Sequence, residues 1–206
     1  MIITKLRVHI APVGFEVDRI VLPAIEMKVD KIWLLIHNNQ EDGRVKSYEV
    51  EIVKKFKKAK IEVKLLRTNR KDIFKILHAV KQIIKSEEEN DIYINVSSGS
   101  KIQAIACMMA CMMFNDGKNL TPYYAEPQSY PVYKEKQQSV GLKSIMKLPK
   151  YQIQVPRQEL VRALKIIQNN ESRITKKEMA RLAEAENPNT AKHLSLIHIS
   201  EPTRPY

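Results

Sequence analysis

The chain has 206 residues, a formal net charge of +12, 28% charged residues and 44% hydrophobic residues. This length accommodates one large domain and a small one, with enough apolar side chains for a hydrophobic core. No apolar run approaches the roughly 20 residues of a membrane-spanning helix. The N-terminus lacks the apolar core of a signal peptide, and Cys107 and Cys111 form no disulfide framework, so we expect a cytoplasmic protein without a membrane partner.

The excess positive charge lies mostly before Tyr151 and has two interpretations. A basic chain favours nucleic acids or nucleotides as partners. Alternatively, lysine-rich stretches such as residues 54–58 form solvated helix faces. The composition leaves both interpretations open.

Strand-like and helix-like segments alternate along the first 150 residues. We predict strands at 6–10, 31–37, 61–66, 92–94, 120–125 and 141–148, and helices at 17–27, 44–58, 71–85 and 102–114. This alternation predicts an α/β fold: a Rossmann-like, mainly parallel sheet with flanking helices. It would form one domain over residues 1–149, followed by a proline-flanked linker over 150–156.

A truncated, all-α helix-turn-helix segment is predicted over residues 157–193. Its first helix covers 157–168, and Thr175 to Glu178 form a capping box that opens a second helix. Residues 187–189 would be the turn and Thr190 the start of a recognition helix. Residues 194–204 match the in-frame translation of a transposase sequencing adapter. We therefore treat residues 194–206 as an artefact and expect the natural sequence beyond His193 to be missing.

Two predicted strand-to-helix loops carry the candidate ligand site. A small-residue turn before a helix start aims backbone N–H groups and the helix dipole at one point, which suits a phosphate. In the second loop, hydroxyl donors precede a lysine; in the first, a glycine permits close backbone approach. The predicted ligand-binding residues are Gly14, Phe15, Glu16, Ser97, Ser98, Gly99, Ser100 and Lys101. Arg19, His37 and Asn38 are further candidates, and the role of Glu16 stays open.

Other chemistries receive less support from the residues. The second loop lacks the spacing of a Walker phosphate loop, and Ser98 with Lys101 matches Ser-x-x-Lys without its companion motifs. The cysteine- and methionine-rich stretch 107–113 supplies too few ligands for zinc and indicates a packed core or a dimer-facing helix. His9 and His78 lie in apolar patterns and are interpreted as structural. No catalytic constellation, metal site or cofactor is predicted.

Together, residues 14–19 and 95–101 resemble the CARF family of ligand-sensing domains, which are linked to CRISPR immunity. The likeness is greatest to archaeal transcriptional regulators that place this domain before a winged helix-turn-helix. It implies that the two loops bind a cyclic oligoadenylate across a homodimer interface and that the C-terminal domain binds DNA. The corresponding DNA-binding residues would be Thr175, Lys176, Lys177, Asn189, Thr190 and Lys192. Two alternatives remain: a ring nuclease that cleaves such a messenger, and a sensor or interaction module for another nucleotide.

Overall fold

The computed structural model describes residues 4–38, 43–115, 119–131, 138–151, 153, 158–169, 175, 178 and 181–182. The chain divides into two compact units, Met1–Ile153 and Gln154–Tyr206. In the described ranges, no helix combines the length and apolar character needed to span a membrane.

The first unit is built on a six-stranded sheet with the order β3-β2-β1-β4-β5-β6. Its strands are β1 (Arg7–Pro12), β2 (Lys31–His37), β3 (Glu62–Thr68), β4 (Asp91–Asn95), β5 (Leu120–Glu126) and β6 (Ser144–Lys147). All neighbouring strands are parallel except β5 and β6. The predicted Rossmann-like, mainly parallel α/β fold is confirmed, with β6 beginning three residues later than expected.

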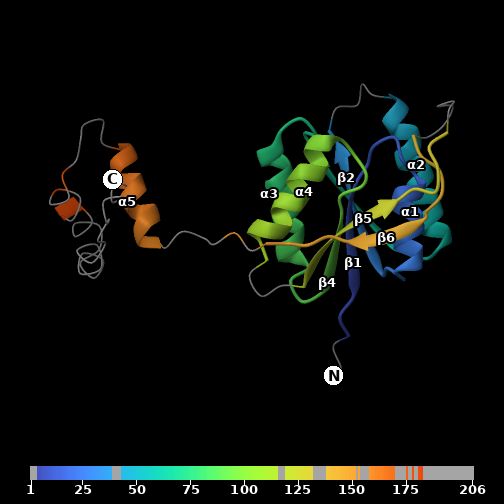
Figure 1. Ribbon diagram of the computed structural model, residues 1–206, viewed down its shortest axis with the longest axis horizontal. Coiled ribbons are helices and arrows are strands. Elements are labelled where there is room, and N and C mark those ends of the chain that lie inside the picture. Colours follow the sequence, from blue (N-terminus) through green and yellow to red (C-terminus); the bar gives the residue numbers. More distant parts are fainter. Residues whose placement is uncertain are drawn as a thin grey trace, which may run out of the picture. The chain divides into compact units, whose positions relative to one another are not determined.

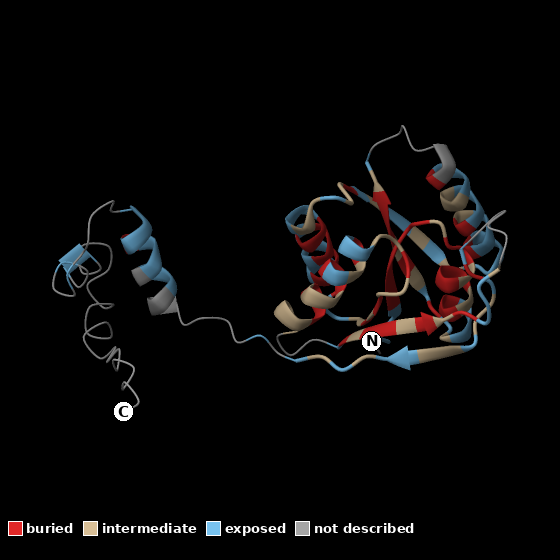
Figure 2. Ribbon diagram, turned by 45° about the horizontal axis from the view of Figure 1, so that its top comes forward, coloured by how far each residue is buried: buried red, intermediate tan, exposed pale blue. Residues whose placement is uncertain are grey.

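Four helices cover the two faces of this sheet (Figure 1). They are α1 (Asp18–Glu26), α2 (Gly43–Lys58), α3 (Ile73–Ser86) and α4 (Lys101–Met113). The pairs α1/α2 and α3/α4 lie on opposite sides, and each encloses its own apolar cluster against the sheet. Figure 2 shows buried residues concentrated in the strands and on the inward sides of the helices. Cys107, Ala110 and Cys111 belong to the α3/α4 cluster, the two cysteines as buried thiols, so the packed-core interpretation is confirmed for these residues.

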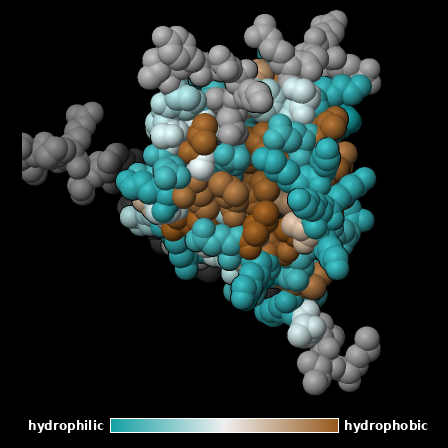
Figure 3. All heavy atoms as spheres, turned by 90° about the vertical axis from the view of Figure 1, so that its right-hand side faces the viewer, coloured by the Kyte–Doolittle hydropathy of each residue, from teal (hydrophilic) through white to brown (hydrophobic). Residues whose placement is uncertain are grey.

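The α1/α2 side presents an apolar area framed by hydrophilic side chains (Figure 3). On this layer, α2 and the edge strand β3 also enclose a shallow groove of about 400 Å³. The two glutamates of α2 precede a lysine-rich end, and Lys55 pairs with Glu51 at 3.2 Å.

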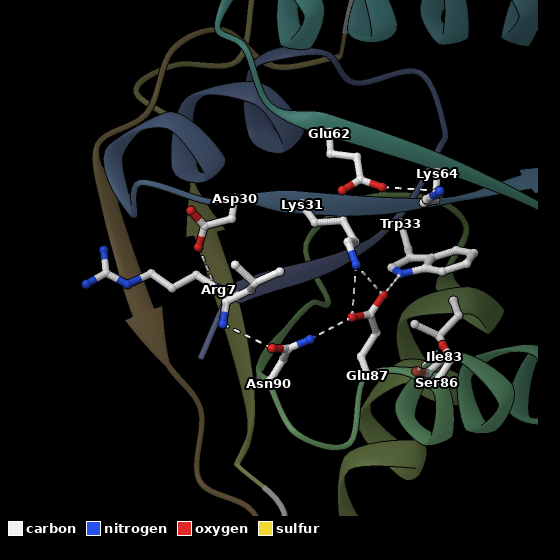
Figure 4. A network of polar contacts seen from close by, with 11 residues as sticks. Arg7, Asp30, Lys31, Trp33, Glu62, Lys64, Ile83, Ser86, Glu87 and Asn90 are labelled. Carbon is white, nitrogen blue, oxygen red and sulfur yellow. Dashed lines mark hydrogen bonds and ion pairs between the residues drawn. The ribbon is translucent and has the colours of Figure 1, made fainter. Parts of the chain in front are cut away.

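A polar network fastens the amino end of the sheet to the end of α3 (Figure 4). The Glu87 carboxylate is buried and accepts hydrogen bonds from Trp33 Nε1 at 2.9 Å, Lys31 Nζ at 3.1 Å and Asn90 Nδ2 at 2.8 Å. Burial alone would raise the pKa of Glu87, but these hydrogen bonds outweigh it and lower the pKa below its usual value. The network lies at the amino end of the sheet, away from the carboxyl ends of the strands, and its role is to hold the end of α3 against the sheet.

In the second unit, α5 (Gln158–Asn169) has a buried Ile166. The predicted capping box is formed, because Glu178 N–H donates to Thr175 Oγ1 at 3.3 Å while Thr175 N–H donates to Glu178 Oε2 at 3.0 Å. Of the six predicted DNA-binding residues, the structure describes only Thr175. The other five lie outside the described residues, as do the predicted turn at 187–189 and the stretch 194–206; they are Lys176, Lys177, Asn189, Thr190 and Lys192.

Candidate functional site

The candidate site lies where the chain reverses its direction of travel across the sheet. From β1 the chain passes through α1 and α2 outward to β3, and α3 then carries it back across to β4 on the other side of β1. The carboxyl ends of β1 and β4 are therefore neighbours, and the loops after them diverge to opposite faces. In open α/β sheets, such a topological switch point is where ligands bind.

Two glycines allow these switch-point loops, residues 13–17 and 96–100, to touch backbone to backbone. A Cβ atom added to Gly14 would lie 3.0 Å from Gly99 Cα. Gly99 itself has φ +79°, and a Cβ atom there would lie 2.5 Å from Pro12 Cβ. Neither position accepts a larger residue without movement of the opposite loop. Both glycines were predicted from the sequence as site residues, and the structure brings them into contact.

Asn95 and Ser98 lock the two loops together from within. The buried Asn95 side chain donates from Nδ2 to Arg19 O at 2.8 Å and accepts from Ser97 N at 2.8 Å. Ser98, only 2% exposed, donates from Oγ to Pro12 O at 2.9 Å. The hydroxyl proton of Ser98 is thus used in the hydrogen bond to the neighbouring segment. Asn95 was predicted only as the start of the motif, and its bond to Arg19, 76 positions away, left no sequence signal.

The first turn of α4 offers the accessible part of the site. Ser100 is its N-cap: Ser100 Oγ accepts from Gln103 N at 3.2 Å, and Gln103 Oε1 accepts from Ser100 N at 2.9 Å. Lys101 follows as an exposed residue, while Ser97 and Gly99 are half-buried. A positive side chain at the positive end of a helix dipole makes this edge favourable for an anion.

The residues after β1 are more enclosed than the sequence suggested. The Glu16 carboxylate is buried, accepts from Ser139 Oγ at 2.6 Å and lies 3.8 Å from Arg19 Nη1. Burial raises the pKa of Glu16, although Ser139 and Arg19 oppose the shift. Phe15 packs its ring edge-on against Tyr48, with 5.7 Å between the ring centroids. The structure therefore places Glu16 and Phe15 against other elements of the protein.

Two buried donors at the switch point remain unused. Arg19 is 7% exposed; its Nε donates to Ala125 O at 3.0 Å and its guanidinium lies 4.8 Å from the Tyr124 ring centre. Among the described residues, neither Arg19 Nη2 nor Gln103 Nε2 has a hydrogen-bond partner. Both belong to the first turns of the helices that follow the switch-point loops. Unsatisfied buried donors are costly, and a bound acceptor would satisfy them.

His37 and Asn38, at the end of β2, lie beside the end of β3 and not beside the switch-point loops. His37 Nδ1 is 3.4 Å from Thr68 O and 3.4 Å from Arg70 N. Asn38 is exposed at the rim of a separate cavity beside α3. The structure thus does not gather these two candidates with the others.

The two histidines interpreted as structural differ. His9 is fully buried, its Nδ1 lies 3.1 Å from Tyr123 Oη, and burial lowers its pKa to about 3. The structural interpretation of His78 is wrong, because His78 is exposed on α3 while its neighbours Ala79 and Val80 take the inward positions. Among the described residues, no group of three or more acidic, histidine or cysteine side chains could hold a metal ion.

The sheet order and the flanking helices define a Rossmann-like α/β protein. Residues 7–130, more than half of the chain, match the family described as "HFX_2341_N:-like, N-terminal", and the protein belongs to this family. The chain is 31% identical to the uncharacterized protein MJ1513 of Methanocaldococcus jannaschii over 87% of its own length, and it spans 61% of that relative.

Solved structures resemble the chain more distantly. Can2 from Sulfobacillus thermosulfidooxidans in complex with cyclic tetra-adenylate has 15% identity and a TM-score of 0.46, over 58% of this chain and 30% of Can2. Csm6 of Enterococcus italicus, bound to cyclic hexa-2′-fluoro-hexa-dAMP, has 11% identity and a TM-score of 0.48, over 93% of this chain and 54% of Csm6. Because these sequence identities and TM-scores are low, the bound ligands are facts about Can2 and Csm6 and do not extend to this chain.

Proposed function

We propose that the first unit is a CARF-type sensor that binds a cyclic oligoadenylate at the switch-point loops. The observation that carries the proposal is the contact of Gly14 with Gly99, which joins two helix N-termini into one edge beside the exposed Lys101. The phosphates of the ligand would accept hydrogen bonds from the backbone N–H groups of the two helix N-termini and would pair with Lys101. Other acceptor atoms of the ligand would bind the unused donors of Arg19 and Gln103.

A second copy of the chain would complete this site. Ile102 is 41% exposed and Ile105 is 55% exposed, and they follow Lys101 on one side of α4. Apolar side chains next to a ligand edge favour a twofold dimer, which would place two copies of each loop around a symmetric ring. The complete protein would then act as a ligand-responsive archaeal transcriptional regulator, with its C-terminal domain binding DNA.

A thermal-shift titration of the 206-residue chain tests the sensor. Cyclic tri-, tetra- and hexa-adenylate are compared with linear oligoadenylates of the same lengths, and Lys101→Ala serves as the site variant. At about 100 times its dissociation constant, the correct ring should stabilise the chain by roughly 2.7 kcal/mol. The absence of a shift with all three rings, from a folded chain, would refute the proposal.

Product chromatography after incubation separates binding from cleavage. A regulator returns the ring intact, whereas a ring nuclease opens it to a linear product. In the second case, Lys101 would stabilise the negative charge that develops on the phosphate. A response to another nucleotide alone would instead identify a different sensor or interaction module.

A further inference from the structure

The outward side of α3 is basic over its whole length and carries no acidic residue. Its sequence from Ile73 to Ser86 contains neither Asp nor Glu. Besides Ser86 at its end, its exposed residues are Phe74, Lys75, His78, Lys81, Gln82 and Lys85. With 3.6 residues per turn, these six positions fall within about 120° of the helix circumference. They therefore form one surface, which we call the α3 face.

A cavity of about 530 Å³ opens beside the first turns of the α3 face. Phe74, Lys75 and His78 line it from α3, and Thr68 with Asn69 line it from the end of β3. The Phe74 side chain is 79% exposed at this cavity, although an aromatic ring gains free energy by burial. Besides these amide and hydroxyl groups, the Arg67 guanidinium and the Asp72 carboxylate line the cavity, and Asp72 Oδ1 accepts from Phe74 N and Lys75 N at 3.1 Å as the cap of α3. An accessible aromatic ring among hydrogen-bonding groups is a combination suited to a nucleobase.

The spacing of the lysines points to a chain of phosphates. Lys75 and Lys85 are ten residues apart, which corresponds to about 15 Å along a helix. They cannot converge on one phosphate, but with Lys81 they can contact successive phosphates of a polymer. Lys75 has an ion pair with Asp72 at 3.9 Å, and such exposed pairs contribute little. Lys81 lies 5.3 Å from the Phe114 ring centre, with its charge still available to solvent.

We propose that the α3 face and its cavity bind single-stranded nucleic acid. Lys75, Lys81 and Lys85 contact the phosphates, and Phe74 stacks on an unpaired base in the cavity. An unpaired base is required because the bases of a duplex are already stacked on each other. This site is separate from the switch-point loops and does not depend on the sensor proposal.

The test is fluorescence anisotropy of a labelled twelve-nucleotide oligothymidine with the full 206-residue chain at 50 mM and 200 mM salt. Three phosphate contacts on a single strand predict that affinity falls roughly 20-fold between these concentrations. Phe74→Ala should weaken binding roughly ten-fold, and Phe74→Trp should preserve it. The double variant Lys75→Gln/Lys85→Gln should bind more weakly and show a shallower dependence on salt.

The matched control is Lys54→Gln/Lys57→Gln on α2, which removes the same charge from the other side of the sheet. It should retain most of the affinity. The proposal is overturned if this control loses as much affinity as the α3 double variant, if Phe74→Ala has no effect, or if the chain does not bind the oligonucleotide at 50 mM salt. All these positions are exposed, so the variants should unfold at nearly the same temperature as the original chain.

Discussion

Replacing Gly99 by alanine tests whether the two switch-point loops must touch. A non-glycine residue in the left-handed conformation of Gly99 costs about 1–2 kcal/mol. The new Cβ would also lie 2.5 Å from Pro12 Cβ, and a proline ring cannot rotate away. Forcing an atom into such a packed site costs about 1–3 kcal/mol more. We therefore expect Gly99→Ala to lower the free energy of unfolding by about 2–5 kcal/mol.

Gly141→Ala is the matched control for the backbone contribution. Gly141 has φ +73°, and its added Cβ would lie 2.8 Å from Gln128 Oε1 and 3.0 Å from Gln128 Cβ. The Gln128 amide can rotate away and its Cβ has to give only slightly, so the left-handed conformation is the main cost, about 1–2 kcal/mol. Urea unfolding followed by the fluorescence of Trp33, the single tryptophan, reports on the first unit. Equal destabilisation by the two variants would refute the importance of the loop contact.

Three further predictions concern buried polar groups. Ser98→Ala should cost about 1–2 kcal/mol because it leaves the carbonyl of Pro12 without its buried donor, and a loss below 0.5 kcal/mol in urea unfolding would contradict this role. Lowering the pH from 7 to 5 should destabilise the first unit by about 2 kcal/mol. The reason is that His9 takes up a proton near pH 6.5 in the unfolded chain, whereas burial holds the pKa of His9 in the folded protein at about 3. If His9→Gln loses the same stability over this pH range, His9 is not the cause. Glu87→Gln should cost about 2 kcal/mol at pH 7. Because folding lowers the pKa of Glu87, its carboxylate contributes to stability above the unfolded pKa, and this contribution is lost as the pH falls. The difference in free energy of unfolding between Glu87→Gln and the original chain should therefore shrink in acid. A difference that stays constant with pH would disprove the ionic part of the contribution.

The sequence predicted the sheet well because strands and helices differ in hydrophobic period. Buried parallel strands such as β2 are continuous apolar runs, while α3 repeats its apolar residues at helical spacing. The strand β6 was placed too early because Gly141 and Lys143 belong to a loop. Their N–H groups bond to Asp18 Oδ2 and Glu126 O, which are contacts with distant segments.

Side-chain roles were harder to predict because partners far along the chain decide them. Glu87 opens the run of three glutamates at 87–89, which in sequence indicates a solvated segment, yet it is buried because Lys31 and Trp33 of β2 supply its hydrogen bonds. Similarly, Glu16 is enclosed by Ser139, which lies 123 positions away. Local sequence shows that a residue is polar, but only the tertiary structure determines whether it faces solvent or a buried partner.

The contacts divide the predicted site into a supporting part and an accessible part. Ser98 and Gly14 hold the loops together, whereas Lys101 stays open at the start of α4. At its other end, α4 contacts the segment that leads to the second unit, because Ile153 N–H donates to Met112 O at 3.2 Å. The helix α4 thus connects the proposed ligand edge with the last residue of the first unit. Under the sensor proposal, a ligand that shifts α4 would therefore also act on Ile153, at the start of the connection to the second unit.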